Sequence, residues 1–200
     1  NKEFNIQCDL KVIPMEGWTR NMYYEDTKLA WILPSPNMPT VETAVVYNGT
    51  CIFEGTNLSE GRGTTKPFEF VGAPWLNAGK LADKLNELSL EGVLFRPVFF
   101  TPTFSKHAGA LCKGVQLHVT DRNSFSAVKT GLYLLEEIIK MSGDYFEYLP
   151  SLSPKGKPMI DYNTGNDYIR THDFSAAEVY EEYKKEEEVF QKRKEKYHMY

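Results

Sequence analysis

Two stretches in the middle of the chain have the apolar patterning of β-strands. Residues 115–120 alternate strictly between apolar and polar side chains, which predicts a strand buried on one face. Residues 93–100 (VLFRPVFF) are apolar almost throughout and also predict a strand. Pro97 places this second strand at a sheet edge or a bulge, because proline cannot donate to a hydrogen-bond ladder. Three shorter apolar runs predict further strands at residues 8–13, 30–33 and 51–53.

Helical spacing of apolar residues predicts four helices, each preceded by a capping side chain. Thr40 caps a short helix over residues 41–47 that ends at Gly49, and Asn77 caps a helix that ends at Gly92. Caps between Asp121 and Ser126 open a helix that closes at Gly143. Ser175 and Glu178 form a capping box for a last helix that runs to about Tyr197. The apolar positions expected to face inward in the last three helices are Leu81, Leu85, Leu88, Phe125, Val128, Leu132, Leu135, Ile139, Val179, Tyr183 and Phe190.

Residues 150–165 hold a Ser-Pro-Lys-Gly-Lys-Pro turn cluster and predict a loop. Strands that alternate with helices indicate an α/β fold. A weak boundary is expected near Pro67, where a polar segment gives way to this alternation.

Composition limits the classes of molecule that the chain is expected to bind. The chain has 200 residues, 42% of them hydrophobic, and a net charge of −4, so it can build a core but offers no basic field for nucleic acid. The lysines between Lys184 and Lys196 are matched by glutamates, which is typical of a solvated helix face. No apolar run approaches the roughly 20 residues that span a bilayer. Cys8, Cys51 and Cys112 lack metal-site or disulfide spacing and are expected to be buried small hydrophobes.

The segment Glu54–Thr65 is the strongest candidate for a binding site. It contains three glycines, two carboxylates, one arginine, one amide and four hydroxyls, and only Leu58 can join a core. So many hydrogen-bonding groups in a glycine-permitted shape favour a loop that holds a polar ligand. The alternative is a solvated surface loop, since loops are generally polar.

Glu54, Glu60 and Arg62 are the chemically most informative side chains of this loop. Two carboxylates near an arginine can hold a sugar hydroxyl, an acetamido group or a carboxylate, and paired carboxylates also hydrolyse glycosides. The spacing fits equally well a structural Glu–Arg pair that shapes the loop. The glycines do not form a nucleotide site, because Gly61-Arg62-Gly63-Thr64 lacks the Gly-Lys-Ser/Thr of a phosphate loop and no helical pattern follows.

A second polar loop follows the apolar strand at 93–100. Its Lys106 and His107 could contact an anion or relay a proton, or the loop could simply bond its own backbone. The irregular spacing of His107, Cys112 and His118 does not favour a metal site. Core packing is the better interpretation of Trp18, Trp31 and Trp75, with stacking on a sugar as the alternative.

Several long motifs, in this order along the chain, resemble the NamZ family of exo-β-N-acetylmuramidases. The resemblance covers about residues 8–145. The motifs are residues 33–40 (LPSPNMPT), 54–65 (EGTNLSEGRGTT), 67–69 (PFE), 72–75 (GAPW), 100–109 (FTPTFSKHAG) and 114–121 (GVQLHVTD).

The resemblance implies a Rossmann-like N-terminal catalytic domain, a smaller C-terminal α/β domain and a cleft between them. It implies a bacterial, periplasmic or secreted hydrolase of the cell wall that releases N-acetylmuramic acid from non-reducing ends of peptidoglycan. On this basis residues 1–65 are the end of the catalytic domain, and residues 66–200 are the C-terminal domain. The chain begins at Asn1 without Met, and we expect the principal catalytic acid in a preceding N-terminal part of the protein.

The resemblance also implies roles for individual residues. Glu54 or Glu60 is expected to be a second catalytic carboxylate or an orienting group. Arg62, together with Lys106 or His107, is expected to pair with the lactyl carboxylate, and no metal or cofactor is expected. The hydroxyls and the acetamido group are expected to bond to Asn57, Ser59 and Thr64. The expected partners are peptidoglycan fragments and the N-terminal part of the same protein. The alternative function is a non-catalytic carbohydrate-binding domain.

Overall fold

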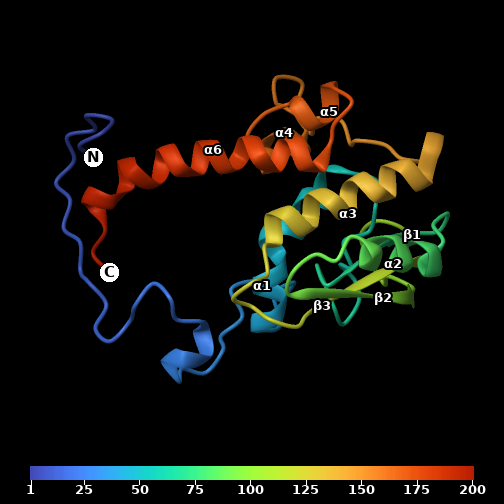
Figure 1. Ribbon diagram of the computed structural model, residues 1–200, viewed down its shortest axis with the longest axis horizontal. Helices are drawn as coiled ribbons and strands as arrows, with labels where there is room; N and C mark the ends of the chain where they lie inside the picture. The colour runs from blue at the N-terminus through green and yellow to red at the C-terminus, as the bar shows by residue number, and fades with distance from the viewer.

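A computed structural model describes all residues from 1 to 200 and has a mixed α/β fold (Figure 1). One small sheet lies beside α2, while α3 and the long α6 run side by side above it in the view of Figure 1. The α/β class expected from the sequence is therefore confirmed. The helices are α1 (Val41–Thr50), α2 (Ala78–Glu87), α3 (Ala127–Ser142), α4 (Met159–Thr164), α5 (Tyr168–Thr171) and α6 (Ala176–Lys194).

The sheet has three antiparallel strands, β1 (Phe70–Ala73), β2 (Val93–Phe100) and β3 (Cys112–Val119), in the order β1-β3-β2. The predicted strands at 93–100 and 115–120 are confirmed, and β3 begins three residues earlier than expected. β2 lies at the edge of the sheet, one of the two positions that Pro97 predicted. The four-residue β1 was not predicted, because its pattern is too short to show a period.

One face of the sheet carries the core. Val71, Val115 and Leu117 are almost fully buried there, and α2 packs over them through Leu81 and Leu85. Each fully buried leucine or valine contributes about 1.5–3 kcal/mol relative to an exposed one. This packing fixes β1 and β3, and β1 pairs with the Glu54–Thr65 loop described below.

Side-chain caps at the four predicted helix starts are confirmed. Thr40, Asn77, Ser126 and Ser175 each accept a hydrogen bond from the backbone N–H three residues ahead. The helix after Thr40 is longer than expected, because Gly49 continues it. A Cβ on Gly131 of α3 would lie 2.2 Å from the Gly49 carbonyl oxygen, so glycine at this crossing lets α1 and α3 touch through their backbones.

Several sequence predictions are wrong. Residues 8–13 and 30–33 form no strand and are largely exposed, since no neighbouring strand offers them a ladder. Residues 51–53 belong to a 3-10 helix, η2 (Cys51–Gly55), because α1 runs straight into it. The predicted loop at 150–165 contains α4.

Some residues expected inside are exposed, because no other element of the fold covers them. These are Cys8, Leu88, Val128 and Phe190. Cys112 is buried as expected, and burial raises the pKa of its thiol to about 11.

None of the helices combines the length and apolar character needed to cross a membrane.

Candidate functional site

The Glu54–Thr65 loop pairs with the rest of the fold at two points in its first half. Ser59 pairs with Gly72 of β1 through two backbone hydrogen bonds of 2.9 and 3.0 Å. Thr56 forms an isolated bridge with Tyr148. Most of the loop is buried or half-buried, so the alternative of a solvated surface loop is wrong.

Two glycines give the loop its shape. Gly61 and Gly63 have φ of 78° and 80°, a conformation that side chains with a Cβ rarely adopt. A Cβ on Gly63 would meet the backbone N and O of Phe104 at 2.7 and 2.6 Å. The Gly63 carbonyl also accepts hydrogen bonds of 2.9 Å from Thr103 N and Oγ1, so the two predicted polar loops are in direct contact.

Four of the predicted site residues form one charged network. The Arg62 guanidinium donates from Nη2 to Glu54 Oε1, and its Nε lies 3.1 Å from Glu60 Oε1. Lys106 Nζ lies 2.6 Å from Glu60 Oε2. The Glu60 side chain is only 2% exposed, so both of its oxygens are enclosed by cations from two loops. Arg62 also lies over the ring of Phe68, 5.0 Å from its centroid.

The ammonium group of Lys106 is bound by other groups of the protein. Besides Glu60, its Nζ donates to the carbonyls of Phe53 at 2.7 Å and Thr56 at 2.9 Å. Burial lowers the pKa of this ammonium, and the Glu60 carboxylate opposes that shift. Two backbone hydrogen bonds and one ion pair hold this ammonium, so its geometry is that of an anchor for the loop.

Arg62 and Glu54 still have hydrogen-bonding groups available to a ligand. Arg62 Nη1 and Glu54 Oε2 make no hydrogen bond to the protein, and both side chains are about a quarter exposed, at 28% and 25%. A guanidinium with one edge fixed by carboxylates can still present donors to an anion in its own plane. The network therefore exposes one cationic and one anionic group side by side.

The remaining predicted residues bond mainly to backbone. Asn57 donates from Nδ2 to Tyr145 O at 2.8 Å and accepts at Oδ1 from Glu147 N at 3.1 Å. His107 Nε2 lies 2.7 Å from the Asn57 carbonyl oxygen. Thr64 Oγ1 donates to Gly61 O at 2.6 Å. Ser59 is buried, and its Oγ accepts from Gly61 N. In this structure these four side chains stabilise the loop and its neighbours.

Two aromatic residues beside the loop were not among the predicted site residues. Tyr145 stacks on Trp75 with ring centroids 6.1 Å apart, and Trp75 also meets the edge of the His107 ring at 5.3 Å. Trp75 lies in the motif at 72–75, but nothing in the sequence around Tyr145 signals its position. Trp31 lies elsewhere, with its Nε1 bonded to Met38 O.

A separate cleft lies away from this network. It has a volume of about 620 Å³, lies between α5 and α6 and is lined by residues such as Tyr168, Val179 and Tyr183. No group of three or more His, Cys, Asp or Glu side chains is arranged to hold a metal ion.

Comparisons with known proteins agree on one family. Residues 45–200 match the family model described as exo-beta-N-acetylmuramidase NamZ, C-terminal, and residues 1–42 match the corresponding N-terminal model. The two matches meet between residues 42 and 45, and the boundary predicted at residue 65 stays a prediction. The Glu54–Thr65 loop and Lys106 both fall within the C-terminal match.

The chain is also 49% identical to the Bacillus subtilis (strain 168) protein named peptidoglycan beta-N-acetylmuramidase NamZ, over all of this chain and 48% of the relative. It thus spans about half the length of that curated relative. Two crystal structures of DUF1343 family proteins from Bacteroides fragilis NCTC 9343 have similar folds. Their TM-scores are 0.84 and 0.70 at 32% and 27% identity, each covering 96% of this chain and 51% or 49% of the solved one. Since the C-terminal family model alone matches more than half of its residues, the chain belongs to the exo-β-N-acetylmuramidase NamZ family.

Proposed function

We propose that the full protein is a glycoside hydrolase that releases N-acetylmuramic acid from non-reducing ends of peptidoglycan fragments. We further propose that the Glu54–Thr65 loop lines its substrate cleft. Family membership supports the reaction class. The observation that carries the role of the loop is the network in which Arg62 and Glu54 keep free groups while Glu60 and Lys106 are enclosed.

The sugar supplies groups that match this arrangement. N-acetylmuramic acid carries a lactyl carboxylate, and the unused edge of Arg62 can pair with it through charge-assisted hydrogen bonds. The free oxygen of Glu54 can accept from a sugar hydroxyl or act on water as the second carboxylate. Glu60 and Lys106 then act indirectly, by holding Arg62 and the loop backbone in position. The principal acid is assigned to a part of the full protein that corresponds to the unmatched half of the relatives.

Alanine variants in the full-length protein test the proposal. Glu54→Ala, Glu60→Ala and Arg62→Ala are each expected to lower kcat/KM for a chromogenic N-acetylmuramic acid glycoside by about tenfold or more, the scale of a lost transition-state contact. Lys80→Ala is the control, because Lys80 is exposed and distant in sequence from the network. Full activity in all three network variants would contradict the proposal.

The second candidate is a non-catalytic carbohydrate-binding domain. It is favoured by one observation, that Glu60 is enclosed by two cations and is not placed to touch a ligand. Titration with muramic-acid-containing fragments separates the two candidates: binding without turnover by the full-length protein supports this candidate alone.

Action on peptidoglycan would place the protein outside the cytoplasm, and we propose that it is periplasmic or secreted. Fractionation of the native host tests this, with recovery of the protein only in the cytosol as the contrary result. The proposed partners are peptidoglycan fragments and the N-terminal part of the same protein.

A further inference from the structure

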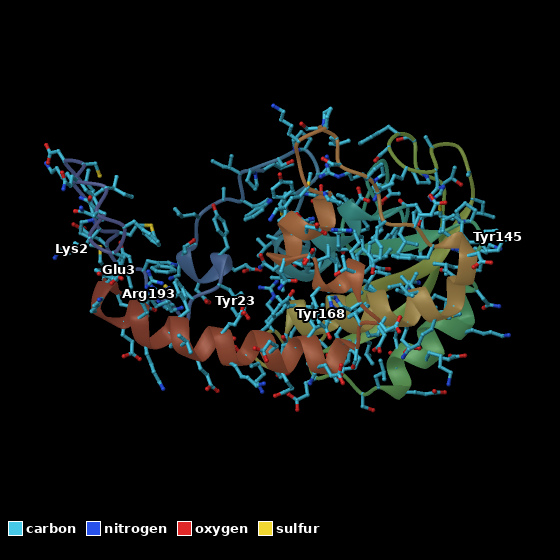
Figure 2. All side chains as sticks on the ribbon, turned by 90° about the horizontal axis from the view of Figure 1, so that it is seen from above. Lys2, Glu3, Tyr23, Tyr145, Tyr168 and Arg193 are labelled. Atoms are coloured by element: carbon cyan, nitrogen blue, oxygen red, sulfur yellow. The ribbon has the colours of Figure 1, made fainter.

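The side chains Tyr145, Trp75 and His107 form an aromatic cluster that the proposed function has not used. They come from the turn after α3, the segment after β1 and the loop before β3. Tyr145 is 68% exposed, an unusual state for a large aromatic side chain that is fixed in place. Figure 2 shows it at the periphery of the molecule beyond the end of α3.

The position of Tyr145 is fixed by the polar loop. The Asn57 side chain donates from its amide nitrogen to Tyr145 O and accepts at its amide oxygen from Glu147 N. One side chain therefore bonds to the backbone of the turn at two positions. Asn57 N also donates to Glu147 O at 3.0 Å. These bonds hold the turn against the loop in one arrangement.

The Tyr145 ring is also held by a contact with a second aromatic side chain. Trp75 stacks beneath Tyr145 at an interplanar angle of 21°, and its Nε1 donates to Ser142 Oγ at 3.1 Å. With centroids 6.1 Å apart the two rings are offset, so Trp75 covers only part of one face and most of the Tyr145 ring stays exposed. The result is a flat apolar surface with a hydroxyl at its rim, which suits the apolar face of a sugar ring.

The cluster lies directly beside the charged network. Lys106 and His107 are consecutive residues, and they bond to the carbonyls of the consecutive residues Thr56 and Asn57. Lys106 belongs to the network and His107 to the aromatic cluster. Consecutive Cα atoms are about 3.8 Å apart, so the two features adjoin on the same loop pair.

We propose that the open face of Tyr145 is a subsite for a second pyranose ring, the N-acetylhexosamine linked to the released muramic acid. This inference rests on the proposed function, since it places the muramic acid at Arg62 and the next sugar on Tyr145. It makes Tyr145 a specificity-determining residue for the length of the substrate.

Two substrates of the full-length protein test the subsite: the methyl β-glycoside of N-acetylmuramic acid and the disaccharide in which it is linked to N-acetylglucosamine. Tyr145→Ala is expected to raise KM for the disaccharide roughly fivefold or more, the scale of one aromatic stacking contact, and to leave KM for the methyl glycoside unchanged. Tyr145→Trp keeps a flat ring and is expected to retain the wild-type disaccharide KM. Tyr162→Ala is the matched control, because Tyr162 is also an exposed tyrosine, on α4, outside the cluster.

An unchanged disaccharide KM in Tyr145→Ala, or an equal rise for both substrates, would overturn the subsite while leaving the proposed function intact. Failure of the wild-type protein to cleave either substrate would instead overturn the proposed function, and the subsite with it.

Discussion

Lys106 Nζ lies 2.6 Å from Glu60 Oε2, and this contact joins two loops that are 46 residues apart in the sequence. The same ammonium bonds to the carbonyls of Phe53 and Thr56, where the loop begins. Glu60 in turn holds Arg62, whose free edge is the proposed binding group. The position of Arg62 therefore depends on a lysine that does not reach the ligand.

Replacing Lys106 with methionine removes one partner of a buried ion pair. Lys106→Met is expected to destabilise the fold by roughly 3 kcal/mol, because Glu60 would stay buried with a single cation. Urea unfolding measures the loss, with Lys80→Met as the exposed control. In the double variant Lys106→Met/Glu60→Gln the loss should be smaller than the sum of the single losses. Additive losses would show that the two side chains do not interact.

Glycine at the α1–α3 crossing gives a stability prediction with an internal control. Gly131→Ala places a methyl group against the Gly49 carbonyl and is expected to destabilise by roughly 2 kcal/mol through overpacking. Gly79→Ala in α2 meets nothing closer than 3.7 Å and is expected to stabilise by about 0.5–1 kcal/mol from helix propensity. Thermal unfolding of both variants checks the opposite signs, and two changes of the same sign would contradict the packing argument.

The pair of Asp161 and Arg170 gives a pH prediction. Arg170 donates to Asp161 from Nε at 2.8 Å and from Nη2 at 2.7 Å, and these bonds lower the pKa of the carboxyl. A carboxyl with a lowered folded-state pKa stabilises the fold above its unfolded pKa of about 3.9, and this contribution is lost as pH falls through the folded value.

At pH 7, Asp161→Asn is expected to lower the melting temperature by about 5 °C. The difference from the wild type should begin to shrink below about pH 4, where the carboxyl of the unfolded chain becomes protonated, and should vanish once the pH falls below the lowered pKa of the folded state. A difference that stays constant from pH 7 to pH 2 would show that the charge of Asp161 does not matter.

Helix starts were the part of the fold that could be predicted best from the sequence, whereas the helix expected to end at Gly92 ends at Glu87. Thr40, Asn77, Ser126 and Ser175 are local signals, since each cap bonds to a backbone group only three residues away. Strands depend on partners elsewhere in the chain. The apolar run at 8–13 resembles a strand but has no ladder to join, whereas the short β1 gains its structure from β3.

The same distinction between local and distant partners applies to the candidate site. The loop composition and the motif series singled out Glu54, Glu60 and Arg62, and the structure joins these three side chains in one network. Their relation to Lys106 could not be derived, because it depends on how two distant loops pack. For the same reason the sequence could not show that the Asn57 amide donates to the backbone at Tyr145, or that Tyr145 stacks on Trp75.

The most direct test of the central claim is whether Arg62 recognises the lactyl carboxylate. The measurement compares kcat/KM for a chromogenic N-acetylmuramic acid glycoside with that for its lactyl methyl ester, in the full-length wild type and in Arg62→Gln. We predict that the wild type prefers the free acid by about tenfold or more, and that Arg62→Gln loses most of this preference. An equal preference in both proteins would contradict the assignment of Arg62 and of its loop to the muramic-acid site.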